Sequence, residues 1–538
     1  MQWIPDMELP MFRKILFILL FPTLLWGQTY YIDYTTGDDT NTGLTTGTAW
    51  KNVHICLSTN TGNKWSLIGA GDSVLLKKGE SWSPTIAYAL IRPPARKSGT
   101  AGDSIYIGAY GTGARPIVSC VNSPTQDALY LRAVKYFIVD GIEFRGHITW
   151  YTTLTADSIM QHFRFTDNYV DFQYSTNDGI LHYAGQLEVG AENWNLSHLR
   201  YADIGNNYIM NTVSGTMPVG IYIQGGHKLW IHHNTIIGTE TCLDIAEGDS
   251  ITIEYNHMVS TAGLGMKLQA QRHTLDYLVV RGNLVRGVEA AAHMPLVLYQ
   301  ARFAKVYNNT FIARKGNIGT TNNYALTIGW RTSTPAYWTG DGTYGLDGCF
   351  IANNIFFGGV QINTAEPGKI RYYGETDTVY LWWNQDSLRK HNAWRNNVYF
   401  RDTSGTDTRR IRENTFNAVV YSVSPGVYSN SGTETASDYA SSSNLATIWD
   451  GASLTDSTSG SIVTNPLLVN LNGSNISDFT PNADSPCDSA GYAIAEWTED
   501  ILGRAINQAA ITIGAISISD TTIPPHYDYG KKIILKNR

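Results

Sequence analysis

The sequence predicts an all-β chain that coils as a solenoid, in which short strands stack rung upon rung. Between Gly220 and Asn309 each repeating unit holds two short strands of alternating apolar residues. Each second strand ends at an Asn, and successive Asn residues lie 22, 27 and 26 positions apart. The composition, with 50 Gly and only 16% charged residues, is typical of a folded chain rich in strands and turns. One elongated body can use the whole length of such a chain.

The N-terminal residues have the pattern of a secretory signal. Arg13 and Lys14 precede an apolar run from Ile15 to Trp26, and Gly27 follows it. The run is too short to span a bilayer comfortably. We therefore expect residues 1–27 to be a signal peptide, with Met11 as an alternative start. The mature protein is then expected to be secreted, periplasmic or held at the cell surface, with no membrane span.

Four parts are expected after the signal. The spacing of turn Asn residues widens beyond Asn309, which requires loops inserted into the coils. The stretch from 425 to 462 is rich in Ser, Thr, Gly and Ala, and a loose coil or a linker is expected there. The expected parts are an N-terminal cap with the first coils (28–130), a central β-helix with loop insertions (131–424), the last coils with a closing segment (425–518) and a tail (519–538).

The net charge is −7, which argues against a nucleic-acid-binding surface. Attraction of a polyanion would have to come from local Lys and Arg residues or from a bound cation. We expect a monomer, because a solenoid of this length can bury its core alone.

Several N-terminal phrases carry a family resemblance. Tyr31-Ile-Asp33, Gly71 to Trp82, Ser98 to Gly111 and Phe137 to Phe144 resemble the first coils of secreted right-handed parallel β-helix proteins of the pectate-lyase-like superfamily. The resemblance implies a single right-handed parallel β-helix with an N-terminal cap, loop insertions and a C-terminal closing segment. It does not fix the chemistry, because this fold hosts lyases, hydrolases, epimerases, tailspikes and adhesins.

Strand alternation places one column of side chains on an outer face. Leu243 and Ile245 point inward, so Asp244 points outward. The same phase on successive rungs puts Tyr222, Lys267 and Val297 outside. Rungs lie about 4.8 Å apart, so Asp244 and Lys267 should be neighbours. The simplest interpretation is a surface ion pair that contributes under about 1 kcal/mol.

A second resemblance gives that pair a catalytic interpretation. Glu240 to Ile245 and Gly263 to Leu268 resemble the two active-site phrases of family nine polysaccharide lyases. The resemblance implies that Lys267 is the catalytic base and that Asp244 and Glu240 are Ca²⁺ ligands. Glu247 is a further candidate metal ligand. Thr241 and Cys242 depart from the family pattern, where Asp and Gly are expected, and this weakens the calcium site.

The implied reaction is β-elimination on an acidic, uronic-acid-containing polysaccharide. The proton on C5 becomes removable when the neighbouring carboxylate is neutralised by Ca²⁺ or by Arg, here Arg272. A lysine base must be neutral, whereas a carboxylate beside it favours the charged ammonium. The lyase hypothesis therefore needs Ca²⁺ on Asp244, or Asp244 turned elsewhere.

Other polar and aromatic residues near this pair are candidates for substrate binding. Two further functions stay open. A β-helix glycoside hydrolase would need two acids across a groove, and Asp244 with Glu247 is the pair available. A non-catalytic carbohydrate-binding or adhesive β-helix would use the face without cutting. The candidate substrate-binding residues are Tyr222, Gln269, His273, Tyr299, Arg302 and Trp330.

Overall fold

The structure is a computed structural model. It describes residues 27–53, 63–83, 90–120, 127–152, 159–172, 180–184, 199–212, 219–269, 275–287, 294–299, 301–313, 324–328, 348–358, 360–365, 368–370, 379–381, 393–400, 411–417, 421–424, 427–430, 433–439, 461–462, 464–471 and 473–518. The expected signal peptide, apart from Gly27, and nearly all of the expected tail lie outside these residues.

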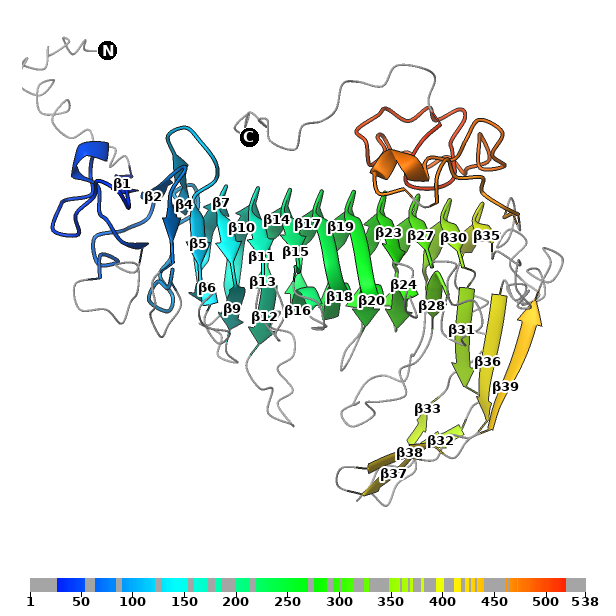
Figure 1. Cartoon of the computed structure of the whole chain (residues 1–538). Helices are drawn as coiled ribbons and strands as arrows, with labels where there is room; N and C mark the ends of the chain where they lie inside the picture. Colours follow the sequence, from blue (N-terminus) through cyan, green and yellow to red (C-terminus); the bar gives the residue numbers. More distant parts are fainter. Residues whose placement is uncertain are drawn as a thin grey trace, which may run out of the picture.

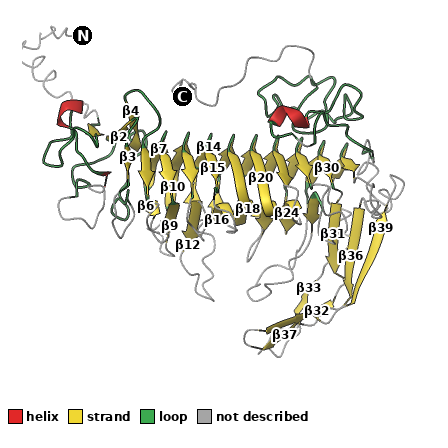
Figure 2. Cartoon of the chain, viewed as in Figure 1, coloured by secondary structure: helices red, strands yellow, loops and turns green. Residues whose placement is uncertain are grey.

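Parallel strands stack along one axis from the N-terminal cap to the C-terminal rungs, as Figure 1 shows. The chain passes through three faces in each turn, called faces A, B and C here. The predicted all-β, single right-handed parallel β-helix is confirmed. Figure 2 shows how little helix accompanies the strands, and the described helices are the 3₁₀ helices η1 (Thr46–Thr48) and η5 (Ile476–Phe479).

Face A precedes the turn Asn of each rung. Its strands are β1 (Thr29–Ile32), β2 (Ser73–Lys77), β4 (Ile105–Tyr110), β7 (Lys135–Asp140), β10 (Met160–Thr166), β14 (Asp203–Gly205), β17 (Trp230–His232), β19 (Thr252–Glu254), β22 (Val279–Arg281), β26 (Lys305–Tyr307), β29 (Phe350–Ala352) and β34 (Ala393–Arg395).

Face B follows the turn Asn. Its strands are β3 (Ser81–Trp82), β5 (Ile117–Ser119), β8 (Glu143–Arg145), β11 (Tyr169–Asp171), β15 (Tyr208–Met210), the first parts of β18 (Thr235–Asp249) and β20 (His257–Gln269), β23 (Leu284–Gly287), β27 (Thr310–Ile312), β30 (Ile355–Phe357) and β35 (Val398–Phe400).

Face C completes each turn. Its strands are β6 (Asp127–Arg132), β9 (His147–Thr152), β12 (Ile180–Ala184), β16 (Val219–His227), the later parts of β18 and β20, β24 (Met294–Tyr299), β28 (Leu326–Ile328), β31 (Val360–Ala365) and β36 (Ile411–Asn417), with β39 (Thr433–Tyr439) antiparallel to β36. The remaining strands are the corner pieces β13 (Leu199–Arg200), β21 (Leu275–Asp276) and β25 (Ala301–Arg302), and the pairs β32 (Gly368–Ile370) with β33 (Val379–Leu381) and β37 (Tyr421–Ser424) with β38 (Val427–Asn430).

The interior is one continuous apolar core that runs along the axis. Alternate side chains of each strand enter it, as Leu243 and Ile245 of β18 do, both with no exposed surface. The core extends from Tyr30 in the cap to Tyr399 in the last rungs. Burial of one apolar stripe per strand therefore sets which side chains point outward.

The predicted asparagine series is confirmed as a buried ladder at the turn between faces A and B. The side-chain oxygen of Asn256, for example, accepts from both the backbone and the side-chain nitrogens of Asn234 at 2.9 and 3.0 Å. The residue before each ladder Asn has a left-handed backbone, with φ between 49° and 62°. The side-chain amides thus satisfy backbone groups that the sharp bend would leave unpaired. The ladder residues are Asn168, Asn207, Asn234, Asn256, Asn283, Asn309, Asn354 and Asn397.

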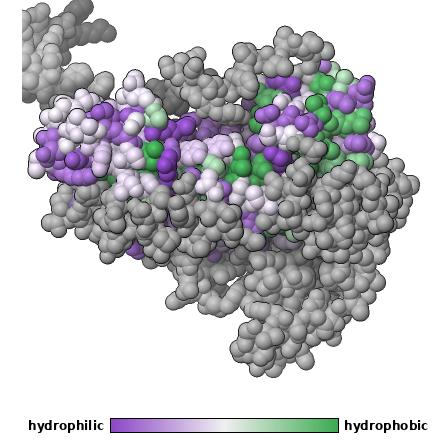
Figure 3. Space-filling view, in the orientation of Figure 1, coloured by the Kyte–Doolittle hydropathy of each residue, from purple (hydrophilic) through white to green (hydrophobic). Residues whose placement is uncertain are grey.

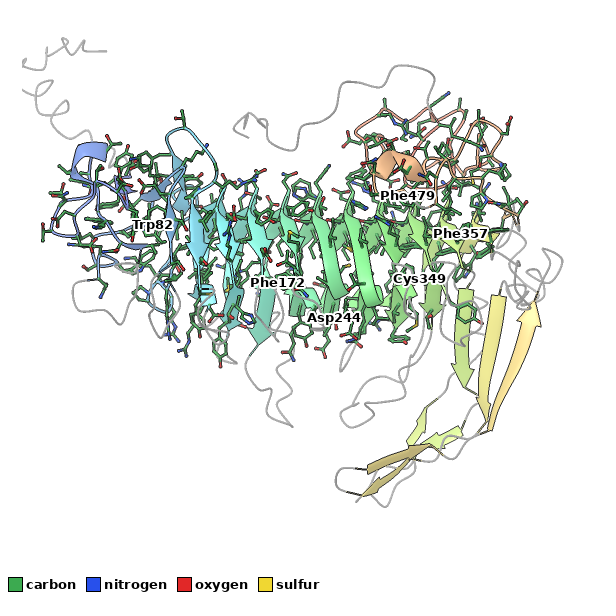
Figure 4. All side chains as sticks on the ribbon, in the orientation of Figure 1. Trp82, Phe172, Asp244, Cys349, Phe357 and Phe479 are labelled. Atoms are coloured by element: carbon green, nitrogen blue, oxygen red, sulfur yellow. The ribbon has the colours of Figure 1, made fainter. Side chains whose placement is uncertain are left out.

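The C-terminal segment 461–518 packs along the outside of this turn. Phe479 and Trp497 join a second apolar cluster with outward residues of the later rungs. Side-chain amides of Asn308, Asn353 and Asn396 donate to backbone carbonyls of the segment. In Figure 4 Phe479 lies at the upper edge of the β-helix and Asp244 at the lower edge. The segment therefore covers the turn of the later rungs and leaves face C to the sites described next.

None of the helices among the described residues is long and apolar enough to cross a membrane.

Candidate functional site

The strand register brings the predicted outward residues into one column on face C. Tyr222 of β16 pairs with Asp244 of β18, Asp244 with Lys267 of β20, and Lys267 with Val297 of β24. The expected adjacency of Asp244 and Lys267 is therefore confirmed. The column arises because Leu243 and Ile245, and Met266 and Leu268 one rung later, are held in the core.

Asp244 and Lys267 form a close, largely buried ion pair. Lys267 Nζ donates to Asp244 Oδ2 at 2.6 Å, and Gln269 Nε2 donates to Oδ1 at 3.2 Å. Asp244 is only 4% exposed, whereas 18% of the Lys267 side chain is exposed. The interpretation as a solvated surface pair is therefore wrong. Removing one partner from such a pair strands a buried charge, which typically costs about 3–5 kcal/mol.

The column is closed on its C-terminal side. Val297 is 1% exposed and Thr327, which pairs with it on the next rung, is 2% exposed. Val297 has the predicted outward phase, because it pairs with Lys267, but its side chain is buried rather than exposed. On the other side of the pair Tyr222 is only half-buried. The exposed part of this column therefore lies at Tyr222, with the buried Asp244 between it and Lys267.

The carboxylates expected to bind calcium are not gathered around Asp244. Glu240 lies in β18 at the irregular pairing between Thr239 and Thr241, and its backbone carbonyl accepts from Ser260 Oγ at 2.8 Å. Glu247 lies near the end of β18 and has a left-handed backbone, with φ of 80°. Within the described residues no three His, Cys, Asp or Glu side chains form a group suited to a metal ion. Ca²⁺ takes six to eight oxygen ligands, from carboxylates, carbonyls and water, so its binding here stays a prediction.

Two more predicted residues are placed by the structure. Tyr299 of β24 pairs with Gln269, so it lies one rung beyond the amide that holds Asp244. Arg302 lies on the short corner strand β25 and donates to both oxygens of Asp276, at 2.9 and 2.7 Å. Its guanidinium thus binds a neighbouring carboxylate of this chain. Arg272, His273 and Trp330 lie outside the described residues.

Sequence reasoning missed a cationic and aromatic patch at the N-terminal end of face C. The Arg92 guanidinium lies 4.6 Å from the ring centre of Tyr130, and that of Arg132 lies 5.4 Å from the ring centre of Tyr151. The two tyrosine rings stack at 6.4 Å. The patch is defined here as Arg92, Tyr130, Arg132 and Tyr151. Alternation in Tyr130-Leu-Arg132 on one strand was the signal available in the sequence.

This patch lies in the same columns as the ion pair. Tyr130 pairs with Thr149, Thr149 with Leu181, and Leu181 with Tyr222, the neighbour of Asp244. Four rung steps separate Tyr130 from Asp244, which is about 19 Å. Beside the patch, burial raises the pKa of Asp127 to about 6, with Thr149 and Arg92 opposing the shift. Face C therefore carries Tyr130 in the column of Lys267, and Arg132 and Tyr151 in a neighbouring outward column.

Comparisons with known proteins leave the activity open. The family described as periplasmic copper-binding protein (NosD) matches residues 155–346, about a third of the chain. No curated protein matches the sequence.

Solved structures that resemble the chain are distant. A GH136 lacto-N-biosidase from Eubacterium ramulus is 14% identical, with a TM-score of 0.40, and the match covers 72% of this chain and 66% of that one, slightly less than two thirds of its length. The pectate lyase Pel9A is 14% identical, with a TM-score of 0.37 and coverage of 91% and 97%. XylC in complex with xylose is 10% identical, with a TM-score of 0.40 and coverage of 91% and 98%. Such low scores carry no argument about function, and the strand pairing itself establishes this chain as a parallel β-helix.

Proposed function

We propose that this protein is an exported polysaccharide lyase that cleaves a uronic-acid-containing polymer by β-elimination on face C. The observation that carries the proposal is the Asp244–Lys267 pair, in which the lysine is the less buried partner and its amine lies 2.6 Å from a possible proton acceptor.

The polymer is proposed to lie along the β-helix axis. Its carboxylates would be bound by Arg92 and Arg132, whose guanidinium groups are held over the rings of Tyr130 and Tyr151. The local cations supply the attraction that the overall charge of −7 opposes. Tyr222 and Gln269 would line the cleavage position, with Tyr299 one rung beyond it.

The base must lose its own proton before it can accept one. A bound polymer excludes water from the pair, and exclusion of water disfavours two separate charges. The proton shared over 2.6 Å is then proposed to move from Lys267 Nζ to Asp244 Oδ2, which leaves a neutral amine beside the substrate. Gln269 holds the carboxyl group in place throughout.

The neutral amine would remove the C5 proton of the uronate. The electron pair of the C–H bond forms the C4–C5 double bond, the C4–O bond breaks, and the departing oxygen takes a proton from the Lys267 ammonium or from water. Arg272, expected from the sequence as the clamp on the substrate carboxylate, keeps that role in the proposal. No step is assigned to Ca²⁺, and adding Ca²⁺ or a chelator tests the assistance that the family resemblance implies.

The test is ultraviolet absorbance of unsaturated uronate products with polygalacturonate, alginate and glycosaminoglycans as substrates. One of these polymers is expected to give product. Asp244→Asn is expected to lower the rate at least about tenfold, because each unit in the pKa of the proton acceptor changes the proton-transfer equilibrium tenfold. A faster Asp244→Asn enzyme would show that Asp244 only holds the lysine charged, and would contradict its role as proton acceptor.

A non-catalytic carbohydrate-binding role is the second candidate, and the intact ion pair favours it, because a paired ammonium is not a base. Binding of a uronate polymer without any product, with and without Ca²⁺, would select this function. New reducing ends without unsaturated product would instead select the hydrolase.

A further inference from the structure

Face A carries an exposed tryptophan that the proposed lyase does not use. Trp230 of β17 is 43% exposed, although a tryptophan in a solenoid strand could equally well be buried. In Figure 1 β17 lies at the upper edge of the β-helix, whereas Figure 4 places Asp244 at the lower edge. The surface around Trp230 is therefore separate from the proposed cleavage site on face C.

The Trp230 ring is held in a fixed position. One of its faces stacks on the buried His232, with ring centres 3.6 Å apart and planes 23° from parallel. Its indole N–H donates to Glu254 Oε1 at 2.6 Å. With one face and the N–H engaged, the opposite face of the indole supplies the exposed surface.

Two ion pairs hold the groups that support this ring. Asp203 accepts from Arg164 at 3.1 Å and contacts His232 Nε2 at 2.9 Å. Glu254 accepts from Arg281 Nε at 2.5 Å. Arg281 also contacts the C-terminal segment, because its Nη1 donates to the backbone carbonyl of Glu496 at 2.9 Å. The exposed indole is thus preorganised before any ligand binds, which reduces the entropy cost of binding.

We propose that Trp230 is the platform of a second carbohydrate-binding site, which takes a neutral pyranose ring of a polysaccharide. The negative face of an indole attracts the weakly positive C–H groups on the apolar face of a sugar. Asp203 and Thr252 flank Trp230 in the same column on the adjacent rungs. Together these three positions span about 10 Å and present a carboxylate and a hydroxyl to sugar hydroxyls.

The charges around the platform favour a neutral sugar over a uronate. Each of the two carboxylates is matched by one guanidinium, Asp203 by Arg164 and Glu254 by Arg281. Asp140 adds a further carboxylate in the column of His232. The guanidinium groups of Arg164 and Arg281 are thus already paired with carboxylates, whereas those of Arg92 and Arg132 on face C lie over tyrosine rings. Figure 3 shows a largely hydrophilic surface along this upper edge between the N-terminal strands and the C-terminal segment.

The test is affinity electrophoresis of the full chain in gels that contain galactan, arabinoxylan or mixed-linkage β-glucan, with polygalacturonate as the acidic comparison. At least one neutral polymer is expected to retard the protein. Trp230→Ala should weaken that binding by about tenfold or more, as loss of a central tryptophan contact does, and Trp230→Phe should retain part of it. Tyr277→Ala is the matched control, because Tyr277 is an exposed aromatic residue (57%) at another turn.

Lys267→Ala should leave binding of the neutral polymer unchanged, which separates this proposal from the lyase. If Trp230→Ala alters the circular dichroism spectrum, Thr252→Arg provides the test, since it covers the platform without removing a supporting contact. Absence of binding to every neutral polymer would overturn the proposal. Undiminished binding by the folded Trp230 and Thr252 variants, or a Trp230 dependence seen only with polygalacturonate, would also overturn it.

Discussion

Lys267 Nζ lies 2.6 Å from Asp244 Oδ2, and the contact joins outward side chains of two adjacent rungs. Because Asp244 is buried, the contact compensates a charge that would otherwise lie unpaired in the protein. Lys267→Met should therefore lower the free energy of unfolding by about 3 kcal/mol. The double variant Asp244→Leu/Lys267→Met should recover most of that loss, because the stranded charge is gone.

Urea unfolding of the two single variants and the double variant measures this coupling. The exposed pair Lys305–Glu496, with nitrogen and oxygen 3.6 Å apart, is the matched control, and Lys305→Met should change stability little. Equal, small effects at the two lysines would mean that the Asp244–Lys267 pair is solvated in the protein.

The asparagine ladder should dominate the stability of the turn between faces A and B. Asn256 has no exposed surface and donates to Ile231 O and to Asn283 Oδ1 while it accepts from Asn234. Asn256→Ala leaves several buried groups unpaired, so we expect a loss of about 3 kcal/mol. Asn507→Ala, at an exposed turn, is expected to cost much less. Comparable urea midpoints for the two variants would contradict a structural role for the ladder.

The sequence predicted the fold and the register because both follow from local patterns. Alternating apolar residues and the recurring Asn determine which side chains point inward, so the neighbours Asp244 and Lys267 could be named in advance. Burial of that pair and of Val297 could not be predicted, because it depends on what covers a face rather than on strand phase. The patch around Tyr130 and the Trp230 platform were missed for a related reason, since both combine residues from several rungs.

Binding of an acidic polymer should depend on the patch at the N-terminal end of face C. Arg132→Gln and Arg92→Gln remove cations that lie over tyrosine rings, so KM for the uronate polymer should rise several-fold with little change in kcat. The effect should shrink at high salt, which screens exposed charges. Arg96→Gln is the control, because Arg96 is exposed and its backbone N–H, not its side chain, bonds to Arg132. A fall in kcat without a change in KM would place the patch in the chemistry instead.

A buried histidine should make stability depend on pH. Burial lowers the pKa of His257 to about 4, and the positive charge of Arg286 adds to this shift. As pH falls below 6.5 the unfolded chain binds the proton first, so stability that is fully present above pH 6.5 is lost as pH falls toward 4. His257→Phe should remove about 2 kcal/mol of that decline. Urea unfolding at pH 7 and pH 4.5 measures this loss of stability. Parallel pH profiles for the variant and the wild type would contradict its assignment to His257.

The central claim is that Lys267 acts as a base, and Lys267→Arg tests it most directly. Arginine keeps a cation beside Asp244, so the fold should survive, but a guanidinium stays protonated and cannot accept the C5 proton. The measurement is the initial rate of unsaturated product from the responsive uronate polymer. The proposed mechanism predicts product with the wild type and a loss of at least about a thousandfold with Lys267→Arg, the scale of general base catalysis. An arginine variant as active as the wild type would contradict the role of Lys267.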